Sequence, residues 1–114
     1  MRKTKLIAVA GVVALAGCAQ EPLSPAQQVM TQAAYLDVTT EQCAAVSGFG
    51  GLTEMQQRSA DLQQKAVSMG AAAGEIENAR NRVRTAFAFS SGMQNRFEAC
   101  NDFMGRSAQI MATT

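Results

Sequence analysis

Apolar and small residues recur at helical spacing from residue 25 to the end of the chain, and no stretch alternates strictly as a strand does. After Leu52 they recur at intervals of three and four, the spacing of a bundle or coiled-coil seam. This seam has a weak member, Ser59, and a charged one, Arg80. Its other members are Met55, Leu62, Ala66, Met69, Ala73, Ile76, Val83 and Phe87. The pattern predicts an all-α fold.

Helix start and stop signals divide the chain into segments. Ser24-Pro25-Ala26-Gln27 combines a cap, a proline at the first helical position and a capping-box partner. Thr53-Glu54-Met55-Gln56 is a second capping box, and Ser91-Gly92-Met93-Gln94 marks a further start. Residues 37 to 40 predict a kink in the first helix. We expect Met93, Phe97, Cys100, Met104 and Met111 to share one face of the last helix.

The first 17 residues have the layout of a secretory signal. Arg2, Lys3 and Lys5 precede an apolar run over residues 6–16, and small residues stand at the expected cut. Because a membrane span needs about 20 apolar residues, the run is too short to be one. We therefore expect residues 1–17 to be a cleaved export signal.

Leu15-Ala16-Gly17-Cys18 resembles the lipobox of bacterial lipoproteins. The resemblance covers only the first 18 residues; the alternative is a buried cysteine in an apolar helix. It implies cleavage before Cys18, a thioether from its thiol to diacylglycerol, and acylation of the new amino group by a chain such as palmitate. Two or three acyl chains on one residue anchor a protein stably to a membrane. Ala19, where an Asp would favour inner-membrane retention, implies the outer membrane, facing the periplasm.

Cys43 and Cys100 are the two cysteines left once Cys18 is acylated. In an oxidising compartment we expect them to form a disulfide, and two free buried thiols are the alternative. The bond would also decide whether residues 54–89 form one long helix or two shorter ones. A continuous helix there would be about 54 Å long and would separate the cysteines, whereas a disulfide needs Cα atoms within about 7 Å.

A chain reversal at residues 70–74 brings both cysteines to the same end of the molecule. We therefore predict a small four-helix bundle over residues 25–114, preceded by a lipidated N-terminus and tether at residues 18–24. The expected helices cover about 25–47, 54–69, 75–89 and 92–111.

Composition excludes several functions. Without the three basic residues of the signal, seven basic residues face nine acidic ones, which does not indicate nucleic-acid binding. The chain has no histidine, its carboxylates are scattered and no phosphate-binding motif occurs. We expect no enzymatic activity, cofactor, metal or small-molecule substrate.

Arg80, Arg82 and Arg84 have two interpretations. They would bind lipid phosphates or an acidic partner, or they form a solvated face partly paired with Glu75 and Glu77. The second interpretation is the simpler one, and we favour it.

The function that these features favour is a non-enzymatic, lipid-anchored envelope protein. It would act as a structural or protein-interaction module that contacts another envelope protein. The alternative is a tethered periplasmic chaperone or inhibitor, which rests on size and cysteine count alone.

Overall fold

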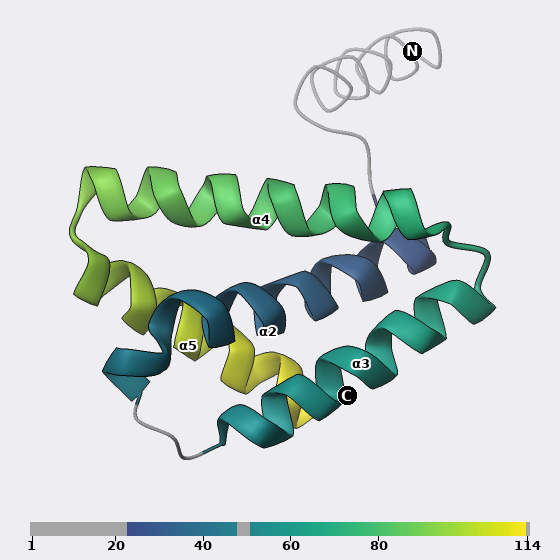
Figure 1. Cartoon of the computed structure of the whole chain (residues 1–114), viewed down its shortest axis with the longest axis horizontal. Coiled ribbons are helices and arrows are strands. Elements are labelled where there is room, and N and C mark those ends of the chain that lie inside the picture. Colours follow the sequence, from purple (N-terminus) through teal and green to yellow (C-terminus); the bar gives the residue numbers. More distant parts are fainter. Residues whose placement is uncertain (1–22, 48–50, 114) are drawn as a thin grey trace, which may run out of the picture.

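The computed structural model describes residues 23–47 and 51–113. These residues form four helices and no strand, and successive helices run in opposite directions (Figure 1). The predicted all-α four-helix bundle is confirmed, and its two central helices are separate. The helices are α2 (Pro25–Ser47), α3 (Leu52–Ser68), α4 (Ala73–Met93) and α5 (Arg96–Thr113).

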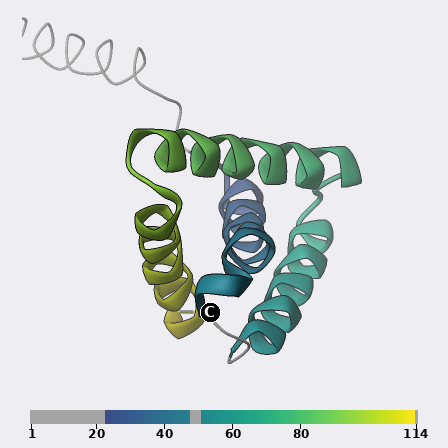
Figure 2. The ribbon, with the colours of Figure 1, turned by 60° about the vertical axis from the view of Figure 1, so that its left-hand side comes forward.

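Helix α2 is the centre of the bundle. It packs against all three other helices, whereas α3 and α5 make little contact with each other. Figure 2 shows α3 and α5 on opposite sides of α2, with α4 lying across the same side of all three. One side of α4 therefore faces the bundle, and none of the other three helices covers the opposite side.

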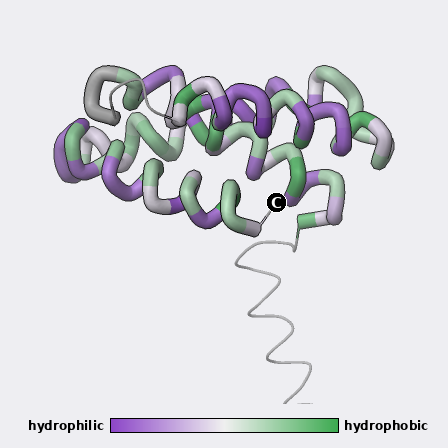
Figure 3. Tube along the Cα trace, turned by 90° about the horizontal axis from the view of Figure 1, so that it is seen from below, coloured by the Kyte–Doolittle hydropathy of each residue, from purple (hydrophilic) through white to green (hydrophobic). Residues whose placement is uncertain are grey.

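The hydrophobic core forms around α2. Hydrophobic and hydrophilic residues alternate along the helices in Figure 3, as expected for helices with one buried face. On α2 the core residues include Met30, Leu36 and Val38. Phe103 of α5 links this core to α4, because its ring lies 5.0 Å from that of Phe87 in an edge-on arrangement.

Small polar residues allow α2 to approach its neighbours closely. Ser59 of α3 and the pair Thr39 and Ser107 are all buried. The Thr39 and Ser107 hydroxyls lie 3.0 Å apart and so join α2 to α5. Every buried side-chain nitrogen or oxygen of the described residues has a hydrogen-bond partner. Burying these polar groups therefore avoids the free-energy cost of leaving a hydrogen-bonding atom unpaired.

The starts of α2 and α3 differ in their capping. At α2 the predicted capping box is present: the Gln27 N–H donates to the Ser24 hydroxyl and the Ser24 N–H donates to the Gln27 side chain. At α3 the predicted box at Thr53 is wrong. This helix begins earlier, after Gly51, whose φ of 81° suits glycine, and it has no side-chain cap.

The boundary between α4 and α5 lies later than predicted. Helix α4 continues to Met93, and the Gln94 N–H still bonds to the Ser90 carbonyl oxygen at 3.0 Å. Helix α5 begins at Arg96, where the Asn95 side chain accepts the Glu98 N–H at 2.8 Å. The predicted start at residue 92 is wrong because Asn95, and not Ser91, provides the cap.

The reversal between α3 and α4 occurs at the predicted place. Gly70 has a φ of 102°, a left-handed conformation that favours glycine, and the Ala71 N–H bonds back to the Ala66 carbonyl oxygen. The Glu75 carboxylate accepts the Ala72 N–H at 3.2 Å and so caps α4. These local bonds end one helix and start the next within five residues.

The predicted disulfide between Cys43 and Cys100 is present. The Cα atoms of the two cysteines lie 5.6 Å apart, and both residues are fully buried. The bond joins the end of α2 to the first turns of α5 across 57 residues. Closing a loop of that length restricts the unfolded chain enough to stabilise the fold by about 4 kcal/mol.

Replacing both cysteines by alanine should therefore destabilise the domain strongly. We expect the free energy of unfolding to fall by about 2–4 kcal/mol and Tm to fall by roughly 10 °C or more. Thermal unfolding followed by circular dichroism measures this. Cys43→Ala and Cys100→Ala alone should each lose about as much as the double variant, since each breaks the same bond. Unchanged Tm in all three variants would show that the thiols are free.

Candidate functional site

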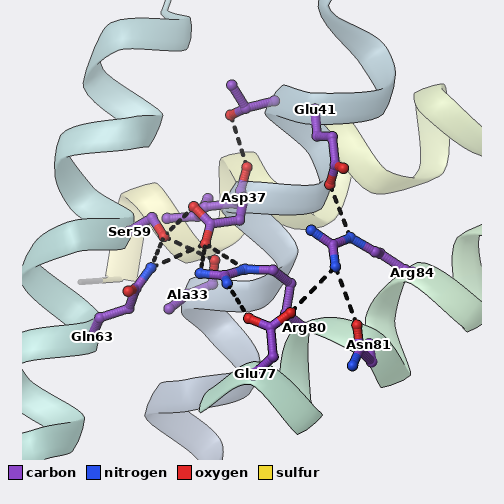
Figure 4. Close-up of polar contacts among 11 residues, drawn as sticks. Ala33, Asp37, Glu41, Ser59, Gln63, Glu77, Arg80, Asn81 and Arg84 are labelled. Atoms are coloured by element: carbon purple, nitrogen blue, oxygen red, sulfur yellow. Dashed lines mark hydrogen bonds and ion pairs between the residues drawn. The ribbon is translucent and has the colours of Figure 1, made fainter. Parts of the chain in front are cut away.

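A network of polar side chains joins α2, α3 and α4 (Figure 4). Its centre is Asp37 on α2, whose carboxylate lies 2.9 Å from Nη2 of Arg80 and 3.0 Å from Nε2 of Gln63. The Ser59 hydroxyl lies 2.6 Å from the same carboxylate and 3.1 Å from the Ala33 carbonyl oxygen. One carboxylate thus receives hydrogen bonds from two other helices.

A second group of charges extends the network along α4. Arg80 also pairs with Glu77 one turn earlier. Arg84 lies 3.1 Å from Glu41 of α2 and 3.5 Å from Glu77. Two of these ion pairs, Asp37–Arg80 and Glu41–Arg84, therefore connect α2 with α4, and Asp37–Arg80 is the better shielded from solvent.

The electrostatics of Arg80 follow from this arrangement. Burial lowers the pKa of Arg80, but the hydrogen bond and charge of Asp37, together with Glu77, more than offset it and raise the pKa above its ordinary value. Arg80 is therefore cationic at neutral pH. The Asp37 carboxylate is committed to three neighbours, which suits a brace between helices better than an acid or base.

The network shows that Asp37 acts between helices and not within α2. The sequence predicts a kink at residues 37 to 40, and α2 continues through them as one helix. Thr40 bonds to the Leu36 carbonyl oxygen at 2.8 Å within the same helix. The Asp37 side chain bonds to residues of α3 and α4, so it stabilises the packing between helices.

The three arginines of α4 have different roles. Arg80 and Arg84 are paired, as the solvated-face interpretation expects, although their acidic partners include Asp37 and Glu41 of α2. Glu75 caps α4 and does not pair with them. Arg82 is exposed, and within residues 23–47 and 51–113 no hydrogen bond or ion pair of its side chain is found.

Three large apolar side chains are exposed at the corner where α4 meets α5. Phe89 is 70% exposed, Met93 72% and Phe97 61%. We call these three residues the corner patch. The prediction that Met93 and Phe97 share one face of the last helix with Cys100 is wrong, because α5 begins only at Arg96 and its buried residues start at Ala99 and Cys100.

The corner patch lies at the end of the bundle away from the start of α2. Helix α2 has 23 residues and is therefore about 34 Å long. Its far end is bonded through Cys43 to Cys100, which follows Phe97 by three residues. The predicted lipid-bearing Cys18 lies outside the described residues but precedes the opposite end of α2, so the patch is distant from the segment that would lead to a membrane.

The described residues contain no group of three or more His, Cys, Asp or Glu arranged to hold a metal ion. Among them no helix has both the length and the apolar character needed to span a membrane. Family models, curated proteins and solved structures were compared with the chain, and none matches it.

The Asp37–Arg80 pair should contribute more stability than the exposed Glu41–Arg84 pair. In a double-mutant cycle of Asp37→Asn and Arg80→Gln we expect a coupling energy of about 1.5–3 kcal/mol, typical of shielded hydrogen bonds to charged groups. The matched cycle of Glu41→Gln and Arg84→Gln should give less than about 1 kcal/mol. Chemical denaturation measures both. Equal coupling energies in the two cycles would refute a bracing role specific to Asp37.

Proposed function

We propose that this protein is a lipid-anchored envelope lipoprotein whose helical domain binds another protein and catalyses no reaction. The anchor is Cys18 in Leu15-Ala16-Gly17-Cys18, and Ala19 favours the outer membrane, facing the periplasm. The observation that carries the interaction role is the corner patch, which the fold leaves uncovered.

The corner patch has the chemistry of a protein-binding surface. Burying a Phe or Met side chain against a partner gains roughly 1.5–3 kcal/mol, and aromatic and Met residues are enriched at such interfaces. Phe89 and Phe97 lie on different helices, so a partner would contact both α4 and α5. The remaining exposed surface of these helices is largely polar.

The patch is held on a rigid part of the fold. Cys100 ties the first turns of α5 to α2, and the Arg96 side chain donates to the Gln42 carbonyl oxygen at 2.8 Å beside it. A surface that is ordered before binding loses less conformational entropy when a partner arrives. The disulfide and this hydrogen bond thus support a preformed docking site.

The non-enzymatic part of the proposal is supported by the side chains that the chain offers for catalysis. The chain has no histidine, and Asp37, the most shielded carboxylate among the described residues, is bonded to Arg80, Ser59 and Gln63. A carboxylate bonded in this way has little capacity left for proton transfer.

Cys18→Ser tests the anchor. Because only a thiol forms the thioether, we expect an unlipidated precursor that keeps its 17-residue signal. Electrophoretic mobility and incorporation of labelled palmitate measure this in the producing cell. Gln20→Ser, two residues further on, is the matched control and should be processed normally. Normal cleavage and lipid incorporation in Cys18→Ser would overturn the lipoprotein assignment.

A photoreactive phenylalanine analogue at Phe97 tests the interaction. In the full chain within intact envelopes we expect irradiation to yield one discrete adduct between this chain and a protein. The same analogue at Gln64, an exposed position on α3, should yield none. Absence of an adduct at Phe97, or equal labelling from both positions, would contradict a docking role for the corner patch.

A further inference from the structure

The end of the bundle where α2 begins carries an uncharged, apolar surface. The turn between α3 and α4 lies there, beside the start of α2 (Figure 1). Residues 66–74, which form this turn and its flanks, read Ala-Val-Ser-Met-Gly-Ala-Ala-Ala-Gly and contain no charged side chain. Val67 is 56% exposed and Met69 is 40% exposed, so two large apolar side chains are left outside the core.

A hydrogen bond between α2 and α3 fixes how far along the bundle these side chains lie. The Ser59 hydroxyl donates to the Ala33 carbonyl oxygen at 3.1 Å. Because the two helices are antiparallel, about eight residues (~12 Å) along each helix from this bond lead to Val67 on α3 and to Pro25 on α2. The end of α3 that carries Val67 and Met69 is therefore level with the start of α2.

Leu23 stands directly before α2 at the same end. It is 45% exposed, and Nε2 of Gln28 donates to its carbonyl oxygen at 3.2 Å, which holds it beside the first turns of the helix. We call Leu23, Val67 and Met69 the tether-end patch. The corner patch lies toward the other end of α2, a helix about 34 Å long.

The proposed tether is too short to let this end move far from a membrane. Six peptide units separate Cys18 from Ser24, and they span at most about 20 Å when fully extended. A lipid-bearing Cys18 therefore keeps the start of α2 within about 20 Å of the acyl chains. The apolar side chains beside that start are the ones that the tether holds close to lipid.

We propose that the tether-end patch contacts the phospholipid bilayer to which Cys18 anchors the chain. This proposal rests on the proposed function, because the anchor brings the patch to the lipid. Insertion of Leu23, Val67 and Met69 at the boundary of headgroups and acyl chains removes their apolar surface from water, as it does for interfacial segments. Once the chain is anchored, this contact is intramolecular, so a patch too small to bind a membrane alone is sufficient.

The charges around the patch fit a phospholipid surface. Lys65 is exposed one turn before Met69, so its ammonium group faces the lipid phosphates when the apolar side chains enter further. Glu75 follows the turn, but its carboxylate accepts the Ala72 N–H at 3.2 Å and is directed to the backbone. Contact through this end stands α2 upright on the membrane and presents the corner patch on the far side of the bundle.

The chain has no tryptophan, so a single introduced one reports on its own surroundings. We expect the lipidated chain with Met69→Trp, reconstituted in vesicles of phosphatidylethanolamine and phosphatidylglycerol, to be quenched by phospholipids brominated on their acyl chains. Thr53→Trp is the matched control, since it is exposed at the other end of α3, about 24 Å away. Its quenching should be weaker by roughly threefold or more. Equal quenching at the two positions would overturn the proposed orientation.

A second set of variants separates apolar contact from mere proximity. The probe is Ala72→Trp, an exposed position within the turn. Replacing Val67 and Met69 together by Gln should lower its quenching roughly threefold, whereas replacing both by Leu should preserve it. Tm should stay nearly unchanged in both variants, because both side chains are exposed. Equal quenching in the Gln and Leu variants would show that the tether alone brings this end to the lipid, and would overturn the proposal.

The outcomes also separate this inference from the proposed function. Mass spectrometry of the same preparation measures the acyl chains on Cys18. Acyl chains on Cys18 without quenching at residue 69 would overturn the membrane contact and keep the anchor. A chain that carries no acyl chain and shows no quenching would overturn both. A photoreactive phenylalanine analogue at Met69 that yields a protein adduct in intact envelopes, and no lipid adduct, would overturn lipid as the occupant.

Discussion

The covalent bond between Cys43 and Cys100 constrains the whole arrangement of helices. It fixes the end of α2 to the first turns of α5, and so requires the chain between them to return to that end of the bundle, which it does by reversing between α3 and α4. A single rod over residues 54–89 is incompatible with it. Phe97 of the corner patch precedes Cys100 by three residues, so the bond that closes the bundle also holds the turn of α5 that carries Phe97.

The Asp37 network complements the disulfide at another point of the bundle. The disulfide joins α2 to α5, whereas Asp37 joins α2 to α3 and α4 through Ser59 and Arg80. Each neighbour of α2 is therefore attached by a specific bond in addition to apolar packing. Apolar burial supplies most of the stability. The directional bonds favour one packing of the helices over others that would bury a similar apolar area.

Sequence periodicity predicted the number and order of the helices, because helical spacing, caps and glycines are local signals. It predicted the disulfide because Cys43 and Cys100 were the pair left over. It did not predict the Asp37 network, whose partners lie 22 to 43 residues away, nor the exposure of Met93 and Phe97. That exposure depends on one boundary: a cap at Asn95 in place of Ser91 changes which residues begin α5.

The central position of α2 has a consequence for how the domain folds. Every other helix packs mainly on α2, and its contacts with α5, such as Thr39 with Ser107, join residues 68 apart. α3 and α5 cannot substitute for each other, since they cover opposite sides. A chain that lacks α5 thus leaves one side of α2 open to water. The bundle is therefore completed only when the last helix packs against α2, and this step joins residues far apart in the sequence.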